Sequence, residues 1–284
     1  MPFNLSMDEA RAMFPEYDFI SALPPSAQKA AFEVRDSDGQ HLCLKVIAPD
    51  YGIDRLEREV LALQSLDHPN VARLIEYTFS TREGHQRHFV IEEFVEGSDL
   101  SASLVDRQPW HLNEVASVFG KLLDGLSEIH DLRIVHRDLK PSNIRMRNGT
   151  DPVIIDLGLA RHLDRTDLTR TEEGAAIGTP AYFSPEQFSG TKHDIDQRTD
   201  LFAVGLLIYQ AAVGTHPFLE EGMSYQNLKD AVLKADDYLS HEGFLALPAE
   251  WQLIVSKLLE HEKVKRPVSS RQVRSVLARI GGQE

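Results

Sequence analysis

The hydrophobic pattern of this 284-residue chain changes about one third of the way along, and the change limits the folds that it can adopt. Before Val95 the apolar residues form short strand-like runs, and AFEVRDSDGQHLCLKVI carries a hairpin turn signal from Ser37 to Gly39. After Gly97 the apolar residues recur mostly at helical spacing, as in NEVASVFGKLLDGLSEIHDL. Strands followed by helices predict an α+β fold, here with two lobes joined within residues 93–98.

This pattern divides the chain into an N-terminal extension (residues 1–15), a small lobe (16–95) and a large, mainly helical lobe (96–284). The small lobe is expected to hold a small antiparallel β-sheet. It should also hold one main helix from Ile53 to Leu66, where apolar residues recur at helical spacing.

The N-terminal extension has two interpretations. Ser6 and Glu9 have the spacing of a capping box, which would open a short helix. The alternative is a frayed and solvated N-terminus.

The balance of charges argues against nucleic acid as a partner. Thirty lysines and arginines stand against 44 aspartates and glutamates, for a net charge of −14. Such an acidic chain has no general attraction to a phosphate backbone, although it leaves room for a local basic groove.

The apolar stretches and the single cysteine indicate the compartment. The most apolar stretch, Leu201 to Gly214, is shorter than the roughly 20 residues that span a bilayer, so it is expected to be a buried helix. The N-terminus lacks the basic start and apolar core of a secretory signal. Cys43 alone cannot form an internal disulfide and suits a reducing compartment. We therefore expect a cytoplasmic protein without a membrane partner.

The run IVHRDLKPSNIRM concentrates polar side chains next to a short predicted strand, Ile144 to Arg147, and a turn at Asn148 and Gly149 leads to a second strand that ends near Asp156. These strands should bring Asn143 and Asp156 to one edge, where amide and carboxylate oxygens suit a hard cation such as Mg²⁺. Nearby, Asp138 would accept a hydrogen bond from an attacking hydroxyl. Lys140 would neutralise charge on a transferring phosphoryl group.

The segment HRDLKPSN resembles the catalytic loop of the protein kinase family, H-R-D-L-x-x-x-N, at every fixed position. The resemblance extends over nearly the whole chain from about Tyr17, and the chain is similar to bacterial-type serine/threonine protein kinases. It implies the two-lobed protein-kinase fold, Asp138 as the catalytic base, Lys140 as a second catalytic residue, and Asn143 and Asp156 as metal ligands. Leu157 replaces the phenylalanine usual after the metal-binding aspartate.

Other segments extend the resemblance. LCLK matches V-A-I-K of the third strand, so Lys45 would hold the α- and β-phosphates of ATP and Glu59 would pair with it. Asp200 would hold the backbone of the catalytic loop. Arg266 would pair with Glu186 in GTPAYFSPEQ, which resembles the segment that ends in A-P-E. Lys140 and Thr179 indicate serine/threonine specificity within the family.

The phosphate-covering loop departs from the family, because the segment Leu23 to Val34 contains no glycine. Pro24, Ser26 and Lys29 stand at its three glycine positions, and a proline has no N–H to donate to phosphate. One interpretation is an active kinase with a stiffer loop, in which Ser26 or Lys29 binds phosphate through its side chain. The other is a pseudokinase scaffold with weak or no nucleotide binding. The nucleotide-binding residues that the resemblance implies are Leu23, Ser26, Lys29, Ala31, Cys43, Lys45, Glu59, Glu93 and Val95.

Two residues near the expected adenine site are unusual. Glu92 precedes the hinge residues 93–95, at a position where apolar side chains are common, so it would need a partner or water. Alternatively, a one-residue slip turns Glu92 outward. Cys43 stands at the alanine of V-A-I-K, where it either lines the pocket or is simply a small buried residue.

The predicted activation loop lies between Gly158 and Ser184 and contains three threonines, Thr166, Thr169 and Thr171. We expect autophosphorylation of Thr169 or Thr171, through self-association of two copies. The added phosphate would bridge Arg137 and Arg161 by charge-assisted hydrogen bonds. The alternative is that the three threonines are ordinary polar residues of an exposed loop.

The resemblance thus implies a signalling transferase that uses ATP and Mg²⁺ on a protein substrate with a serine or threonine acceptor. A small-molecule kinase of related fold is the rival enzyme class.

Overall fold

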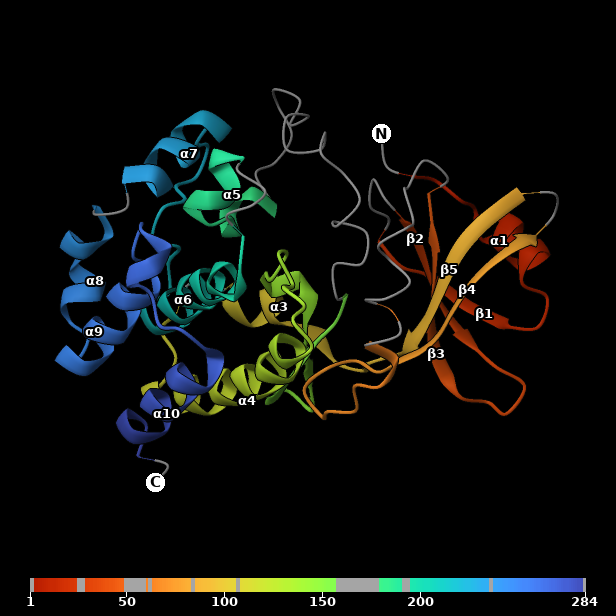
Figure 1. Cartoon of the computed structure of the whole chain (residues 1–284), viewed down its shortest axis with the longest axis horizontal. Helices are drawn as coiled ribbons and strands as arrows, with labels where there is room; N and C mark the ends of the chain where they lie inside the picture. Colours follow the sequence, from red (N-terminus) through yellow and green to blue (C-terminus); the bar gives the residue numbers. More distant parts are fainter. Residues whose placement is uncertain are drawn as a thin grey trace. The chain divides into compact units, whose positions relative to one another are not determined.

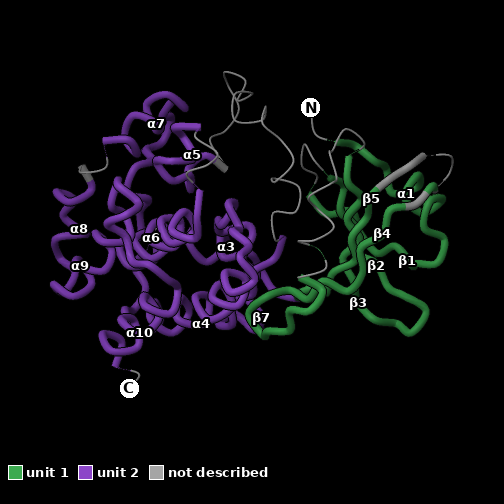
Figure 2. Tube along the Cα trace, in the orientation of Figure 1, with its two compact units in different colours: residues 1–95, 158–164 green, residues 96–157, 165–284 purple. Residues whose placement is uncertain are grey.

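The computed structural model describes residues 3–24, 29–48, 60, 63–82, 85–105, 108–156, 179–190, 195–234 and 237–282. The chain divides into two compact units (Figure 2). The described residues of the first unit end at Val95, and those of the second begin at Glu96.

The first unit is built on a five-stranded antiparallel sheet with the strand order β1-β2-β3-β5-β4 (Figure 1). Its strands are β1 (Asp18–Ala22), β2 (Lys29–Arg35), β3 (His41–Ile47), β4 (Leu74–Arg82) and β5 (His85–Glu93). The predicted turn between β2 and β3 is confirmed: Asp36 accepts hydrogen bonds from the N–H groups of Asp38 and Gln40, and Gly39 has a φ of 79°.

One face of this sheet is apolar and packs against an N-terminal helix. Phe32, Leu44 and Ile91 lie in register on β2, β3 and β5, and belong to a buried cluster with Met13 and Phe14. Met13 is the last residue of helix α1 (Met7–Met13), and Phe14 is its C-cap. The helix therefore covers an apolar face that the sheet would otherwise expose.

Helix α1 begins with a complete capping box. The Ser6 hydroxyl accepts from the backbone N–H of Glu9 (3.2 Å), and the Glu9 carboxylate accepts from the backbone N–H of Ser6 (2.8 Å). Of the two interpretations of the extension, the helix is confirmed. The predicted helix from Ile53 to Leu66 lies mostly outside the described residues, but Val60, Leu63 and Leu66 are buried, as its spacing requires.

The second unit is mainly helical and has a small sheet of three strands, β6 (Ser98–Asp99), β7 (Ile144–Arg147) and β8 (Asp151–Ile154). Its α-helices are α3 (Leu100–Leu104), α4 (Leu112–Asp131), α5 (Pro185–Ser189), α6 (Gln197–Val213), α7 (Tyr225–Lys234), α8 (Glu242–Leu245), α9 (Ala249–Leu258) and α10 (Ser270–Ile280). With the antiparallel sheet of the first unit, these helices confirm the predicted α+β class.

Helix α6 lies in the core of the second unit. It is buried on nearly all sides, which explains why its sequence is apolar without a polar face. Gly205 lets α9 approach closely, because a Cβ at this position would lie 2.7 Å from the Cβ of Leu258. The predicted buried helix is confirmed. Within the described ranges, no helix combines the length and the apolar character needed to cross a membrane.

Candidate active site

The run IVHRDLKPSNIRM begins after α4 and ends in β7, and Asp200 in the first turn of α6 holds its backbone. The two carboxylate oxygens of Asp200 accept hydrogen bonds from the N–H groups of His136 and Arg137, each at 2.8 Å. Arg137 has a φ of 62°, which a non-glycine residue seldom keeps without support. Asp200 therefore stabilises the loop at a strained residue, as predicted.

The Asp200 carboxylate is buried and contacts the imidazole of His130. His130 Nε2 lies 2.9 Å from Asp200 Oδ2, and Ser270 Oγ lies 3.0 Å from His130 Nδ1. Burial alone would raise the pKa of Asp200, but the His130 hydrogen bond, the His130 and His136 charges and the Arg137 N–H hold that pKa below its usual range. The roles of His130 and Ser270 could not be predicted from the sequence, because the two residues are 140 residues apart and no local motif marks them.

Asp138, Lys140 and Asn143 form a compact cluster on this loop. Lys140 Nζ lies 3.1 Å from Asp138 Oδ2. The Asn143 amide nitrogen donates to the same carboxylate oxygen (3.2 Å) and to the backbone carbonyl of Asp138 (2.8 Å). The Lys140 ammonium and the Asn143 amide thus fix the orientation of the Asp138 carboxylate. A carboxylate held in this way is suited to accept a hydrogen bond or a proton from a substrate.

The β7–β8 hairpin brings the backbone of Asn143 next to Ile155, the residue before Asp156. Its register pairs Ile144 with Ile154, and the N–H of Ile155 donates to the carbonyl of Asn143 (2.9 Å). The turn at Asn148 and Gly149 has φ values of 52° and 78°, as the Asn-Gly pair predicts. The expectation that two short strands deliver these residues to one edge is confirmed for their backbone.

The donor set at this edge fits a divalent cation. Both N–H groups of the Asn143 amide point to Asp138, so its amide oxygen remains as an acceptor directed elsewhere. Asp156, two residues after β8, has a left-handed backbone conformation (φ 61°) and would add a carboxylate oxygen. Among the described residues, no cluster of three or more His, Cys, Asp or Glu could cage a metal. A pair of oxygen ligands is instead what Mg²⁺ uses when substrate phosphates and water complete its shell.

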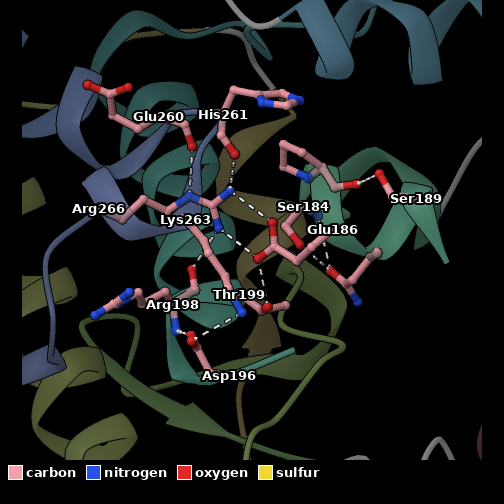
Figure 3. Close-up of polar contacts among 12 residues, drawn as sticks. Ser184, Glu186, Ser189, Asp196, Arg198, Thr199, Glu260, His261, Lys263 and Arg266 are labelled. Carbon is pink, nitrogen blue, oxygen red and sulfur yellow. Dashed lines mark hydrogen bonds and ion pairs between the residues drawn. The ribbon is translucent and has the colours of Figure 1, made fainter. Parts of the chain in front are cut away.

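The predicted pair of Arg266 and Glu186 is present and buried (Figure 3). Arg266 Nη1 and Nη2 bind the two Glu186 oxygens at 2.8 and 2.9 Å, and the Thr199 hydroxyl donates to one of them (2.8 Å). The other Arg266 hydrogen bonds go to the backbone carbonyls of Arg198, Glu260 and His261. All five N–H donors of the guanidinium are therefore used.

This pair also connects to the catalytic loop. Gln187, the residue after Glu186, donates from its side chain to the backbone carbonyl of Arg137 (2.8 Å). Burial would raise the pKa of Glu186, but hydrogen bonding and the charge of Arg266 lower that pKa below its usual value. Glu186 is therefore an ionised, fixed group, and it holds the segment after the predicted activation loop.

In the first unit, Lys45 lies on the face of the sheet opposite α1. It stands in register with Ala31 on β2 and Val90 on β5, while Cys43, two residues earlier, stands opposite Glu92. The Lys45 ammonium forms an ion pair with the Glu92 carboxylate, and both residues are buried. The partner of Glu92 is thus Lys45, and the proposed one-residue slip that would turn Glu92 outward is wrong.

Comparison with known families decides the classification. A family model described as "Protein kinase domain" matches residues 29–277, most of the chain. The chain belongs to the protein kinase family. The predicted two-lobed protein-kinase fold and the predicted family are therefore confirmed.

The curated relatives of this kinase carry serine/threonine names. It is 31% identical over 256 residues to "Serine/threonine-protein kinase pkn2" of Myxococcus xanthus, covering 84% of this chain and 29% of the relative. It is 37% identical over 183 residues to pkn3 of the same organism, covering 61% and 32%. "Serine/threonine-protein kinase Nek5" of Homo sapiens is 30% identical over 262 residues, covering 89% and 35%. The chain spans about a third of the length of these relatives.

The structure places several of the kinase residues that were predicted to bind nucleotide. The N–H of Leu23 donates to the carbonyl of Ala31 (2.9 Å), next to the phosphate-covering loop. Lys29 begins β2, opposite Ile47. Glu93 ends β5, where its N–H donates to the carbonyl of Arg73 (2.9 Å). Val95 and Cys43 are both buried.

Other predicted residues of the kinase lie outside the described residues. They are Ser26, Glu59, Leu157, Arg161, Thr166, Thr169 and Thr171. Their roles stay predictions. The nucleotide, metal and catalytic roles of the residues that are described also stay predictions, although their neighbours are now known.

Proposed function

We propose that this chain transfers the γ-phosphoryl group of Mg-ATP to a serine or threonine hydroxyl of a protein substrate. The arrangement of Asp138 carries the proposal, because Lys140 and Asn143 bind its carboxylate and Asp200 fixes the backbone before it. Membership of the protein kinase family and the names of the relatives support the same reaction. They do not favour the pseudokinase alternative.

In this proposal each catalytic side chain has a separate task. Asp138 accepts a hydrogen bond from the substrate hydroxyl and orients it toward the phosphoryl group. Lys140, within hydrogen-bonding distance of Asp138, stabilises charge on the group in transfer. Asn143 and Asp156 would hold Mg²⁺, which neutralises phosphate charge when it is bound.

The nucleotide would be held by residues of the first unit. Lys45 binds the α- and β-phosphates, and Ala31 and Cys43 are its neighbours on the same face of the sheet. Leu23, Ser26 and Lys29 belong to the glycine-free loop that would cover the phosphates. The hinge residues Glu93 and Val95 would lie at the adenine, and Glu59 would supply a carboxylate to Lys45. We place the kinase domain at residues 16–284, with an extension at 1–15.

We further propose a protein partner and a cytoplasmic location. The chain is too acidic for general binding to nucleic acid, and its single cysteine is buried and suits a reducing compartment. Self-association would let one copy phosphorylate Thr169 or Thr171 of another and so contribute to signalling. A phosphate there would find Arg137, which adjoins the catalytic Asp138, as a cationic partner.

The first test is intact mass after incubation with Mg-ATP. The unaltered chain should gain phosphate, and the Asp138→Ala variant should not, because it lacks the group that orients the hydroxyl. Equal masses before and after incubation, together with failure to bind ATP, would favour the scaffold. Phosphate transfer to a small molecule but to no protein would favour the rival enzyme class.

A further inference from the structure

Lys45 and Glu92 are close because of the strand register. Side chains two residues apart on one strand share a face, so Lys45 and Cys43 lie on one face of β3. Cys43 is opposite Glu92 on β5, which makes Glu92 the diagonal neighbour of Lys45. Diagonal neighbours in a sheet are within reach of long side chains.

The pair is shielded from water. The side chain of Lys45 is 10% exposed and that of Glu92 is 5% exposed. A buried charge is stable only when it is paired or hydrogen-bonded. The Lys45–Glu92 ion pair therefore compensates charge on both of these buried side chains.

The backbone also limits how far Glu92 can move from Lys45. Glu92 and Lys45 belong to adjacent strands that share a continuous ladder from Leu42 to Val46. The lysine ammonium has three N–H donors, so a carboxylate on one side is compatible with phosphate oxygens on another. Glu92 can therefore hold the ammonium in place without blocking a ligand.

We propose that Glu92 is a positioning residue for Lys45, a role that the family resemblance also gives to Glu59. This inference rests on the proposed function, since it concerns the binding of nucleotide phosphates. Glu92 orients the Lys45 ammonium from within the same sheet. Binding of the phosphates should consequently depend on Glu92.

The test compares the affinities of ADP and adenosine for the full-length chain and for Glu92→Gln. Loss of one charge-assisted hydrogen bond should weaken ADP binding by about ten-fold or more. Adenosine binding should not change, because adenosine has no phosphate for Lys45 to bind.

Glu33→Gln is a matched control. Glu33 is on β2, in register with Cys43, and its carboxylate binds His41 (2.6 Å) and the Ser21 hydroxyl (2.7 Å). This variant removes the same charge from the same face of the sheet, but it leaves Lys45 and Glu92 intact. It should keep ADP affinity within about two-fold of the unaltered chain, the scale of a screened long-range charge effect.

Several outcomes would overturn the inference. Tighter ADP binding by Glu92→Gln would mean that Glu92 withholds Lys45 from phosphate. An equal loss of adenosine and ADP binding would mean that Glu92 acts on the base or on folding. Unchanged ADP binding would mean that Glu92 does not position Lys45.

Two further measurements keep the test decisive. If Glu92→Gln shows no cooperative thermal unfolding, and so does not fold, Glu92→Asp takes its place. The Glu92→Asp variant keeps the charge but shortens the side chain by one methylene. Glu92→Asp should still weaken the binding of ADP and leave the binding of adenosine unchanged. If this variant and the unaltered chain bound ADP equally well, the inference would be refuted. Failure of the unaltered chain to bind ADP would overturn the proposed function and this inference together, whereas normal binding with an unaffected Glu92 variant would overturn the inference alone.

Discussion

Each unit of this kinase has a buried ion pair, and the two pairs are built differently. In the second unit, Arg266 binds both oxygens of Glu186 and uses all five of its N–H donors on protein atoms. In the first unit, the point-like ammonium of Lys45 pairs with Glu92 on the neighbouring strand. A planar guanidinium suits permanent bidentate binding, whereas a lysine can turn its donors toward a ligand. The type of cation thus separates a structural pair from one that is suited to phosphate.

The largest expected effect comes from breaking the structural pair. Arg266→Met would leave the Glu186 carboxylate buried without its guanidinium, and removal of one partner of a buried pair typically costs about 3–5 kcal/mol. Denaturant unfolding should show this loss in the free energy of unfolding.

The matched control for this variant is Arg271→Met. Arg271 pairs with Asp131 on the exposed surface, so solvent screens the interaction and the free energy of unfolding should change little. If the two variants lost the same free energy of unfolding, burial would not explain the contribution of the Arg266–Glu186 pair to stability.

A smaller effect is expected from a buried group that is held neutral. Burial lowers the pKa of His216 to about 4, while its Nδ1 accepts from the N–H groups of Phe218 (3.1 Å) and Leu219 (3.0 Å). An unfolded histidine has a pKa of about 6.5, so between these values the unfolded chain binds the extra proton. Stability should therefore fall as the pH falls from about 6.5 toward 4, by about 3 kcal/mol at most.

The melting temperature across this pH range measures the contribution of His216. In His216→Asn the decline should be shallower, whatever the stability of the variant at neutral pH. The lowered pKa values of Glu186 and Asp200 cause stability to be lost only at lower pH, below about 4.5. An unaltered slope in His216→Asn would contradict the assignment.

The smallest expected effect concerns the neighbour of the Lys45 pair. Cys43 is buried and stands opposite Glu92 on the face that carries Lys45. If this face holds nucleotide, ATP at ten times its dissociation constant should slow alkylation of Cys43 about ten-fold, because only the unbound chain reacts. Equal rates of modification with and without ATP would remove Cys43 from the nucleotide site.

Most of the predicted catalytic loop follows from the sequence alone, because its interactions are local. Lys140 and Asn143 meet Asp138 within five residues, and the Asn-Gly turn returns the chain to Asp156. The resemblance to kinases also identified the Arg266–Glu186 pair, although 80 residues separate its members. It did not reveal that His130 and Ser270 support Asp200, since their contacts depend on how α4, α6 and α10 pack.

The N-terminal helix illustrates the same limit. The capping-box spacing of Ser6 and Glu9 was visible, and it left helix and frayed end as alternatives. The apolar cluster that contains Met13 and Phe14 decides between the helix and the frayed end. In this cluster the ring centroid of Phe14 lies 4.8 Å from that of Phe89 in the sheet. A helix of seven residues is marginal in water unless tertiary packing stabilises it.

The sequence by itself determined the family, the α+β class and the local geometry around Asp138, because motifs and short-range spacing encode them. Only the tertiary structure decided which carboxylate meets Lys45 in the sheet. Glu92 is 47 residues away, and the register of β3 and β5 makes them neighbours. A shift of one residue in that register would have turned Glu92 to the other face, since successive side chains of a strand point in opposite directions.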